Sequence, residues 1–452
     1  MSELNKITHD PKVIKTLEEK GILSLEQIAL STPELLGLPD TKAKQINASA
    51  LNVIAEENIE NIEIKTMAIT INLKSNNRAV FNAINFVLNS DIDSCVMRQN
   101  GNSIMLEIKS GKKNKFLDIK KKAEVLNNFI LLKRKEKMKE EGITIPYNEI
   151  IKFAKEKKFE GFYSEFFSDI TGNELMKKTI TVALFSNFEE PVHILVLGDP
   201  GSAKTLARDL LIKNLSGINS IGANATKSGL VCNLSNGELG ALAVSDKKLV
   251  LMDEFDKINK NDLEFCYELL SNGKCSVHSA RVHKDIVSRI ILIAFGNPKS
   301  NVFNDAMPLD DIGMEKTLLS RFAFIIRTDT LNKNEKGKLF KDKLLGKSKL
   351  SEHIGLFDQW IKLARTHRPK MLASETKIDE LVSEAIEIVE KHGSTQLRRD
   401  LRMGDYLRRI AMAFARIDFS DVTDETIDHA YNLIKASIDI WDFKMGRLDF
   451  LD

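Results

Sequence analysis

The sequence predicts an α/β fold in which helices flank a parallel β-sheet. Three short and largely apolar runs, at residues 192–197, 249–252 and 290–295, have the composition of strands that are buried on both faces. A glycine follows the first and the third run, and two carboxylates follow the second. Because ligands bind at the carboxyl ends of parallel strands, we expect the functional site to lie beyond these three ends.

The loop after the first run predicts a phosphate-binding site. Its residues are Gly198, Asp199, Pro200, Gly201, Ser202, Ala203, Lys204 and Thr205, and a helix-like stretch follows them. A glycine-rich loop that leads into Lys-Thr and a helix surrounds a triphosphate with backbone N–H groups. We expect Lys204 to neutralise the β- and γ-phosphates of ATP and Thr205 to ligate Mg²⁺. Ala203 stands where the general motif has glycine, so its backbone must avoid left-handed angles.

Length and composition describe an ordinary globular protein. The 452 residues allow about three domains, and a content of 43% hydrophobic and 29% charged residues is typical of such chains. With a net charge of only +2, any affinity for nucleic acid has to come from local patches. The chain has four cysteines, a polar N-terminus and no apolar run of about 20 residues. We therefore expect a cytoplasmic protein without a disulfide framework or a membrane span.

Residues 1–60 predict a compact helical domain of the helix-hairpin-helix kind. An apolar–glycine–apolar turn at Gly37 separates two helical segments, and Lys42 and Lys44 open the second of them. The backbone N–H groups of such a turn, together with nearby lysines, suit DNA phosphates without reading the base sequence. The segment resembles the small N-terminal domain of archaeal recombinases. A helical module that docks on another protein, or one that merely caps the chain, would show the same helix–turn–helix pattern.

Residues 65–132 predict a small α+β domain whose strand and helix patterns suit a ferredoxin-like arrangement. Several lysines make this segment locally basic, which suits either contact with nucleic acid or a solvated face. We expect residues 133–160 to form a charged linker followed by a helix, because Gly142 and Pro146 end a run of lysines and glutamates.

The other two strand ends supply groups that suit ATP hydrolysis. Asp253 and Glu254 follow the second strand, where the aspartate is suited to holding Mg²⁺ and the glutamate to deprotonating the attacking water. Asn297 follows the third strand and can hydrogen-bond the γ-phosphate or that water. These residues indicate an ATPase core at residues 161–335.

Two arginines are placed as if they served a site shared between subunits. Arg321 precedes a further apolar strand, in the position of an arginine finger that stabilises charge on the phosphoryl group of a neighbour's ATP. Arg402 lies on a predicted helix with Arg409, and their spacing puts both on one face. We expect residues 336–452, which include this helix, to form a helical lid over the nucleotide.

Five motifs resemble, in the same order, those of the minichromosome maintenance (MCM) family of AAA+ helicases. They are GDPGSAKT, GALAVSD, LVLMDEFDKI, FGNP and LLSRF, and the spacing of Arg402, Asp405 and Arg409 is similar as well. The resemblance covers about residues 165–440 and implies an AAA+ P-loop core, ATP with Mg²⁺, and a hexameric ring of identical subunits. It also implies that one subunit provides Lys204, Thr205, Asp253, Glu254 and Asn297, and that the next provides Arg321 and Arg402.

The resemblance further implies two DNA-moving insertions, at residues 222–239 and in a hairpin at residues 275–284. The family's hairpin carries a lysine near its tip, where this chain has Ser279, so Arg281 and Lys284 are the candidates for DNA contact. The segment before the ATPase core is too short for the family's full N-terminal region and lacks its paired cysteines.

The combined patterns predict an ATP-dependent DNA helicase or translocase of the MCM type. Two alternatives stay open: an AAA+ remodelling ATPase of the magnesium-chelatase and MoxR type, which acts on proteins, and an ATP-switched DNA-binding scaffold. The helix-hairpin-helix pattern favours a protein that binds DNA. The intact Glu254 and Arg321 favour hydrolysis over a passive scaffold.

Overall fold

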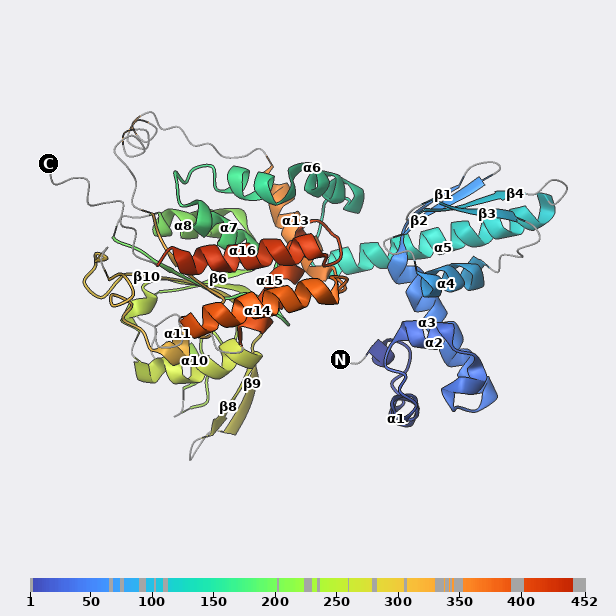
Figure 1. Cartoon of the computed structure of the whole chain (residues 1–452), viewed down its shortest axis with the longest axis horizontal. Helices are drawn as coiled ribbons and strands as arrows, with labels where there is room; N and C mark the ends of the chain where they lie inside the picture. Colours follow the sequence, from blue (N-terminus) through green and yellow to red (C-terminus); the bar gives the residue numbers. More distant parts are fainter. Residues whose placement is uncertain are drawn as a thin grey trace. The chain divides into compact units, whose positions relative to one another are not determined.

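The computed structural model divides the chain into two compact units, Met1–Glu140 and Glu141–Asp452 (Figure 1). The residues that it describes are 3–64, 68–73, 77–88, 95–100, 103–108, 113–200, 203–222, 230–233, 236–258, 260–278, 283–304, 307–329, 337, 341, 344, 353–391 and 402–441. None of the helices in these ranges has the length and apolar character that crossing a membrane requires.

The first unit begins with short helices and ends in an antiparallel sheet backed by two helices. Its helical part comprises η1 (Glu3–Lys6), α1 (Pro11–Glu19), α2 (Leu25–Leu30), η2 (Pro33–Leu36) and α3 (Asp40–Asn58). The rest comprises β1 (Ile59–Ile64), β2 (Ala68–Leu73), α4 (Arg78–Leu88), β3 (Cys95–Asn100), β4 (Ser103–Ile108) and α5 (Lys113–Glu140). The sheet order is β1-β2-β4-β3, so β4 lies between the two strands that α4 connects. This is the split β-α-β unit of a ferredoxin-like arrangement, with an edge strand that enters directly from α3.

One hydrophobic core runs through the whole first unit, from Leu4 to Ile130. We expected residues 1–60 and 65–132 to be separate domains, but α3 packs against α4, and α5 closes over β1. The expected linker also differs, because residues 133–140 continue α5. Ile119, Ala123 and Leu126 form the buried face of α5 and anchor the earlier part of this helix. The lysines and glutamates that follow are good helix formers, so the helix continues beyond the buried part.

The second unit is built on a five-stranded parallel sheet, which confirms the predicted α/β core. The strands are β5 (Ile194–Leu197), β6 (Ile218–Ile221), β7 (Leu249–Met252), β10 (Ile291–Gly296) and β11 (Phe324–Arg327). Their order in the sheet is β11-β5-β10-β7-β6, and every neighbouring pair is parallel. All residues of β5, β7 and β10 are buried, as the continuous apolar runs in the sequence required.

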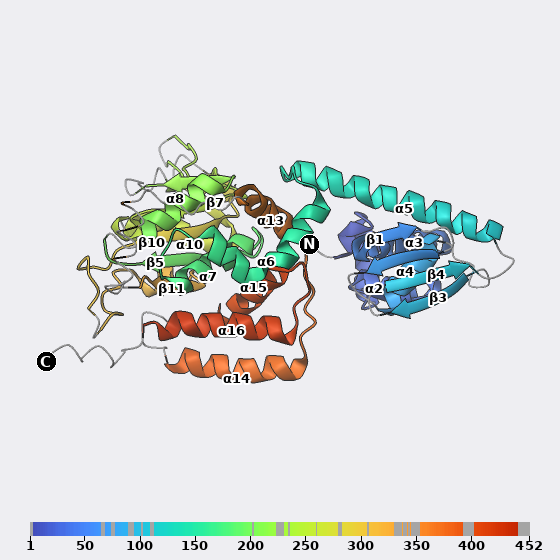
Figure 2. The same ribbon diagram turned by 90° about the horizontal axis from the view of Figure 1, so that it is seen from above.

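Helices cover this sheet and form the C-terminal part of the unit. They are α6 (Tyr147–Phe166), α7 (Glu174–Phe185), α8 (Lys204–Asn214), η3 (Phe255–Lys257), α10 (Lys260–Asn272), α11 (Lys316–Leu319), α13 (Ile354–Thr366), α14 (Glu375–Lys391), α15 (Arg402–Ile417) and α16 (Asp424–Asp439). Helix α7 packs on β5, β10 and β11, and α15 packs on α7. Figure 2 shows α14, α15 and α16 next to one another, in agreement with their contacts.

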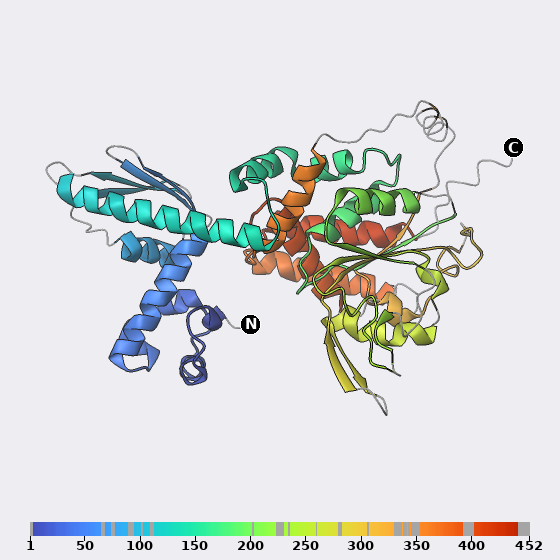
Figure 3. The ribbon, with the colours of Figure 1, turned by 180° about the vertical axis from the view of Figure 1, so that it is seen from behind.

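Two tryptophans join the C-terminal helices to one another and to the parallel sheet. The indole of Trp360 on α13 donates to the carbonyl of Ile417 at 3.0 Å, and that of Trp441 donates to Ile325 in β11 at 2.9 Å. A separate hairpin, β8 (Lys274–His278) with β9 (His283–Val287), projects away from the parallel sheet (Figure 3).

Candidate functional site

The phosphate-binding loop begins where β5 ends, and its first residue has no room for a side chain. A Cβ atom on Gly198 would lie 2.0 Å from Oγ1 of Thr328, which follows β11. Gly201 and Ser202 lie outside the described residues. Ala203 has φ −66° and ψ 0°, in the right-handed region, so its methyl group fits the position that the general motif gives to glycine.

Lys204 opens α8 and is 8% exposed. Its ammonium group donates to the carbonyl oxygens of Gly198 and, at 2.9 Å, of Asp199. Burial lowers the pKa of Lys204 to about 8, against the opposing attraction of Asp199, Asp256 and Asp253. Because burial destabilises the charged form of Lys204, a polyanion placed beside the ammonium group would stabilise that form strongly. Thr205, the next residue, is exposed in the first turn of the same helix.

Asp253 and Glu254 follow β7, which lies between β10 and the edge strand β6. The Asp253 carboxylate accepts from the backbone N–H of Glu254 at 3.0 Å and pairs with Arg208. Glu254 has φ 53° and ψ 39°, a left-handed conformation that is uncommon for a residue other than glycine and is often found at functional sites. Its side chain, 41% exposed, forms an ion pair with Lys257.

Asn297 follows β10, between the ends of β5 and β7. Its backbone N–H donates to Oδ1 of Asp256 at 2.8 Å. A Cβ atom on Gly296 would lie 3.1 Å from the same oxygen, so the glycine permits this close approach. Asp256 therefore connects the segment after β7 with the segment after β10.

The parallel register puts these groups at one edge of the sheet. Leu197, Gly296 and Met252 are the last or nearly last residues of β5, β10 and β7, and the three strands are direct neighbours. Lys204, Asp253, Glu254 and Asn297 all come after these strand ends. This edge thus combines a buried lysine, carboxylates and an amide, which is the set of groups that binds and hydrolyses a nucleoside triphosphate.

Arg321 lies at the opposite edge of the same sheet. It precedes β11, which runs parallel to β5 with Phe324 beside Ile194 and Arg327 beside Leu197. The loop at Lys204 follows the C-terminal ends of these strands, whereas Arg321 is before their N-terminal ends. A four-residue strand is about 13 Å long at 3.3 Å per residue, so the loop at Lys204 and the backbone of Arg321 start from opposite ends of these strands.

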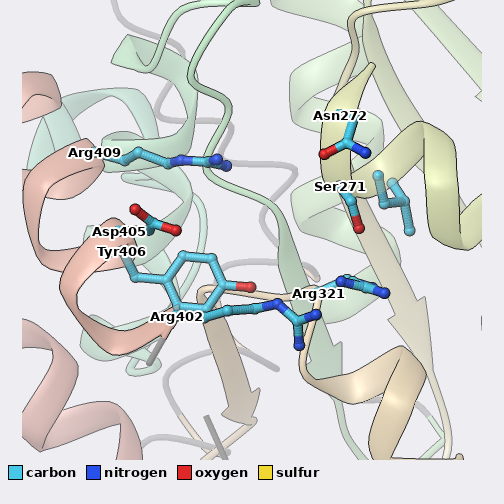
Figure 4. Close-up of a pocket in the computed structure, with 8 residues that line it drawn as sticks. Ser271, Asn272, Arg321, Arg402, Asp405, Tyr406 and Arg409 are labelled. Carbon is cyan, nitrogen blue, oxygen red and sulfur yellow. The ribbon is translucent and has the colours of Figure 1, made fainter. Parts of the chain in front are cut away.

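A pocket of about 230 Å³ surrounds Arg321 (Figure 4). It is lined by Leu270, Ser271, Asn272, Arg321, Arg402, Asp405, Tyr406 and Arg409. The Nε atom of Arg321 is buried and has no hydrogen-bond partner within the described part of the chain. Burial, and after it the nearby Arg402, lowers the pKa of Arg321. Three arginines share this pocket with a single carboxylate, Asp405, and this excess of positive charge indicates an anion site.

A comparison with protein-family models matches residues 147–346 to the MCM P-loop domain. The chain contains a P-loop domain of the MCM family. Curated relatives include the DNA replication licensing factor MCM4 of Oryza sativa, 26% identical over 56% of this chain and 32% of that protein. The minichromosome maintenance protein MCM of Saccharolobus solfataricus is 26% identical over 62% of this chain and 45% of its own length. The aligned region thus spans less than half of either relative.

The MCM domain contains Lys204, Asp253, Glu254, Asn297 and Arg321, whereas Arg402 lies beyond the matched residues. Three residues that line or support the site were missed from the sequence: Arg208, Asp256 and Tyr406. Arg208 and Tyr406 each follow a singled-out residue by four positions on a helix, and that spacing is the signal that would have found them. Asp256 carried no such signal, because its partner Asn297 follows β10, a strand distant from it in the sequence.

The residues that we expected to contact DNA lie in several parts of the chain. In the first unit, Lys42 pairs with Asp10 at 2.6 Å and Lys44 with Asp40 at 2.8 Å, and Gly37 has φ 68° at the end of η2. In the hairpin of the second unit, Lys284 donates to the carbonyl of Gly237 at 2.6 Å. Arg281 and Ser279 lie outside the described residues. All three lysines therefore have partners within the chain.

Proposed function

We propose that this chain is an MCM-type DNA helicase or translocase that hydrolyses ATP at the interfaces between copies of itself in a hexameric ring. The observation that carries the proposal is the placement of the two halves of the ATP site at opposite edges of one sheet. Lys204 follows the C-terminal end of β5, and Arg321 precedes the N-terminal end of β11. Two copies are needed to bring such halves together on one nucleotide.

In the first half of the site, the residues present fit ATP and Mg²⁺. No group of three or more His, Cys, Asp or Glu side chains in the described ranges is placed to hold a metal by itself. That suits Mg²⁺, which usually takes one or two protein ligands and completes its shell with phosphates and water. Thr205 and Asp253 would hold it, and when bound it offsets phosphate charge. Asp253 would exchange its present partner, Arg208, for this role.

The protein groups then have distinct tasks in the proposed reaction. Lys204 binds the β- and γ-phosphates, and Asn297 orients the attacking water or the γ-phosphate. Glu254 accepts the proton of that water as the water oxygen bonds to the γ-phosphorus, while the bond from this phosphorus to the β–γ bridging oxygen breaks and ADP leaves. From the neighbouring copy, Arg321 and Arg402 stabilise the charge on the transferring phosphoryl group.

DNA is the proposed polymer because the relatives are named as DNA replication factors. The candidate contacts are the turn at Gly37 with Lys42 and Lys44, and the hairpin residues Arg281 and Lys284. The exposed carboxylate partners of Lys42 and Lys44 do not prevent this, because surface ion pairs are weak and phosphates can replace them.

The test compares ATP hydrolysis and strand displacement on a forked duplex for wild type, Lys204→Ala and Glu254→Gln. We expect DNA to stimulate hydrolysis by wild type, together with unwinding, and both variants to lose both activities. Hydrolysis that ignores DNA, without strand release, would instead support an ATPase that remodels proteins. A wild-type protein that binds DNA and ATP but hydrolyses nothing would support the scaffold.

A further inference from the structure

Helix α15 contacts the residue that immediately precedes Arg321 at two points. The hydroxyl of Tyr406 donates to the backbone carbonyl of Ser320 at 2.6 Å. One turn earlier on the same helix, Nη1 of Arg402 donates to the Ser320 hydroxyl at 2.7 Å. That hydroxyl in turn donates to the carbonyl of Thr317 at 2.8 Å. Both the main chain and the side chain of Ser320 are thus fixed by α15.

The contact with Tyr406 is shielded from water. Tyr406 is 4% exposed and Ser320 6% exposed, so water has little access to replace a lost hydrogen bond. In Figure 4 the tyrosine ring lies beside Arg402 and extends from α15 toward Arg321.

Arg321 needs such a support because Arg402, a second cation, lies in the same pocket and repels it. Arg321 and Arg402 line the same pocket, and the Nε atom of Arg321 has no partner among the described residues. Without an anion, two cations in one pocket favour conformations that separate them. A fixed main chain at Ser320 limits that separation and keeps the guanidinium of Arg321 in the pocket before the anion arrives.

We propose that Tyr406 is a positioning residue that holds Arg321 in place for the ATP of the neighbouring copy, by fixing the carbonyl of Ser320. The inference rests on the proposed function, in which Arg321 completes a neighbour's site. Arg402 contacts the same serine, so the proposal implies that α15 positions both Arg321 and Arg402 for that ATP.

The first test is steady-state ATP hydrolysis by the full-length Tyr406→Phe variant. Phenylalanine keeps the ring and removes only the hydroxyl. We expect kcat to fall about fivefold to tenfold, the change that the loss of one hydrogen bond produces at tenfold per 1.36 kcal/mol, with KM for ATP unchanged. The matched control is Tyr431→Phe, which removes a buried tyrosine hydroxyl on α16 that interacts with Glu384, and it should leave kcat unchanged.

The second test separates positioning from a structural role by mixing subunits. Lys204→Ala copies cannot use ATP themselves, but they contribute an intact Tyr406 and Arg321 to their neighbours. Adding Lys204→Ala copies to Tyr406→Phe copies should raise the rate of ATP hydrolysis, counted per copy that retains Lys204, toward the wild-type value. A tyrosine that only stabilises its own subunit predicts no rise.

Three results overturn the inference and leave the proposed function intact. The first is an unchanged kcat in Tyr406→Phe, and the second is an equal loss of kcat in Tyr431→Phe. The third is no rise on mixing, while a mixture of Arg321→Ala and Lys204→Ala does recover. If wild type itself hydrolyses no ATP, or if the Arg321→Ala mixture also fails in proven mixed assemblies, the proposed function fails and the inference fails with it.

Discussion

At the scale of single residues, Lys204 shows how the fold prepares a site for its ligand. The side chain is buried against carbonyl oxygens at the start of α8, and three aspartates lie close enough to influence it. Burial has the larger effect and lowers the pKa of Lys204 from 10.5 to about 8. The charged form therefore costs folding free energy below about pH 8, and a triphosphate at the loop would offset that cost.

The lowered pKa of Lys204 predicts a pH dependence of ATP binding. Above about pH 8 the ammonium of the free protein loses its proton, so ATP binding must take up a proton and its affinity should fall about tenfold per pH unit. Binding of a fluorescent ATP analogue between pH 7 and pH 10 measures this. Lys204→Ala should bind weakly without the same decline, and a flat wild-type profile would contradict the prediction.

Asp256 provides a second prediction at this scale, since it positions Asn297 through its Oδ1 atom. Asp256→Ala removes the acceptor, and we expect kcat for ATP hydrolysis to fall about tenfold as Asn297 loses its orientation. Asp256→Asn retains an oxygen at this point and should keep most of the activity at neutral pH. Equal losses in the two variants would show that the charge, and not this hydrogen bond, is what matters.

At the scale of helices and strands, the apolar runs predicted more than the polar residues did. Leu249–Met252 and the other runs are apolar throughout and are buried on both faces, as is typical of strands in a parallel sheet that helices cover on both sides. The neighbours of these strands could not be read from the chain, because parallel pairing joins distant segments. The contact of Asp256 with Asn297 depends on that pairing and was missed for this reason.

The first unit was harder to predict because its helix α5 is mostly polar. Its buried residues, such as Ile119 and Ala123, are few among lysines and glutamates, so the sequence suggested a linker beyond residue 132. The structure continues the helix to Glu140 and joins the predicted pair of domains in one core. Local patterns locate elements, but they do not show which elements share a core.

Substitution of two lysines on helix α3 tests the predicted DNA contact in the first unit. If Lys42 and Lys44 bind phosphates, the double variant Lys42→Ala/Lys44→Ala should reduce the slope of log affinity for DNA against log salt concentration by about 2. Lys15→Ala, which breaks a similar exposed pair with Glu19 on α1, serves as the control and should leave the slope unchanged. An unchanged slope in the double variant would move the DNA contact away from this turn.

At the scale of the whole molecule, the proposed ATP site is divided between two copies of the chain, and each copy would supply one half. Lys204 and Arg321 are at opposite edges of the parallel sheet, and the pocket around Arg321 contains no second phosphate-binding loop among its lining residues. In the proposed ring, a single copy would be inactive and assembly would make it active. Its activity should therefore depend on protein concentration as well as on ATP.

Subunit mixing provides the prediction at this scale. Arg321→Ala and Lys204→Ala proteins should each be inactive, and their mixture should recover part of the wild-type rate, because some interfaces then pair an intact loop with an intact finger. Hydrolysis of ATP by mixed assemblies, verified with two distinguishable tags, is the measurement. A mixture that stays inactive although the tags copurify would place Arg321 outside the neighbour's site.

The contact between Gly198 and Thr328 has a consequence for how successive sites communicate. Thr328 directly follows β11, and Arg321 precedes the same strand, so the segment of residues 321–328 extends from the loop at Gly198 to the arginine that we propose acts on the neighbouring copy's ATP. A movement of the loop on ATP binding would be transmitted along that segment. We therefore expect cooperative hydrolysis, with a Hill coefficient that departs from one, and a loss of this cooperativity when Thr328→Gly removes the contact.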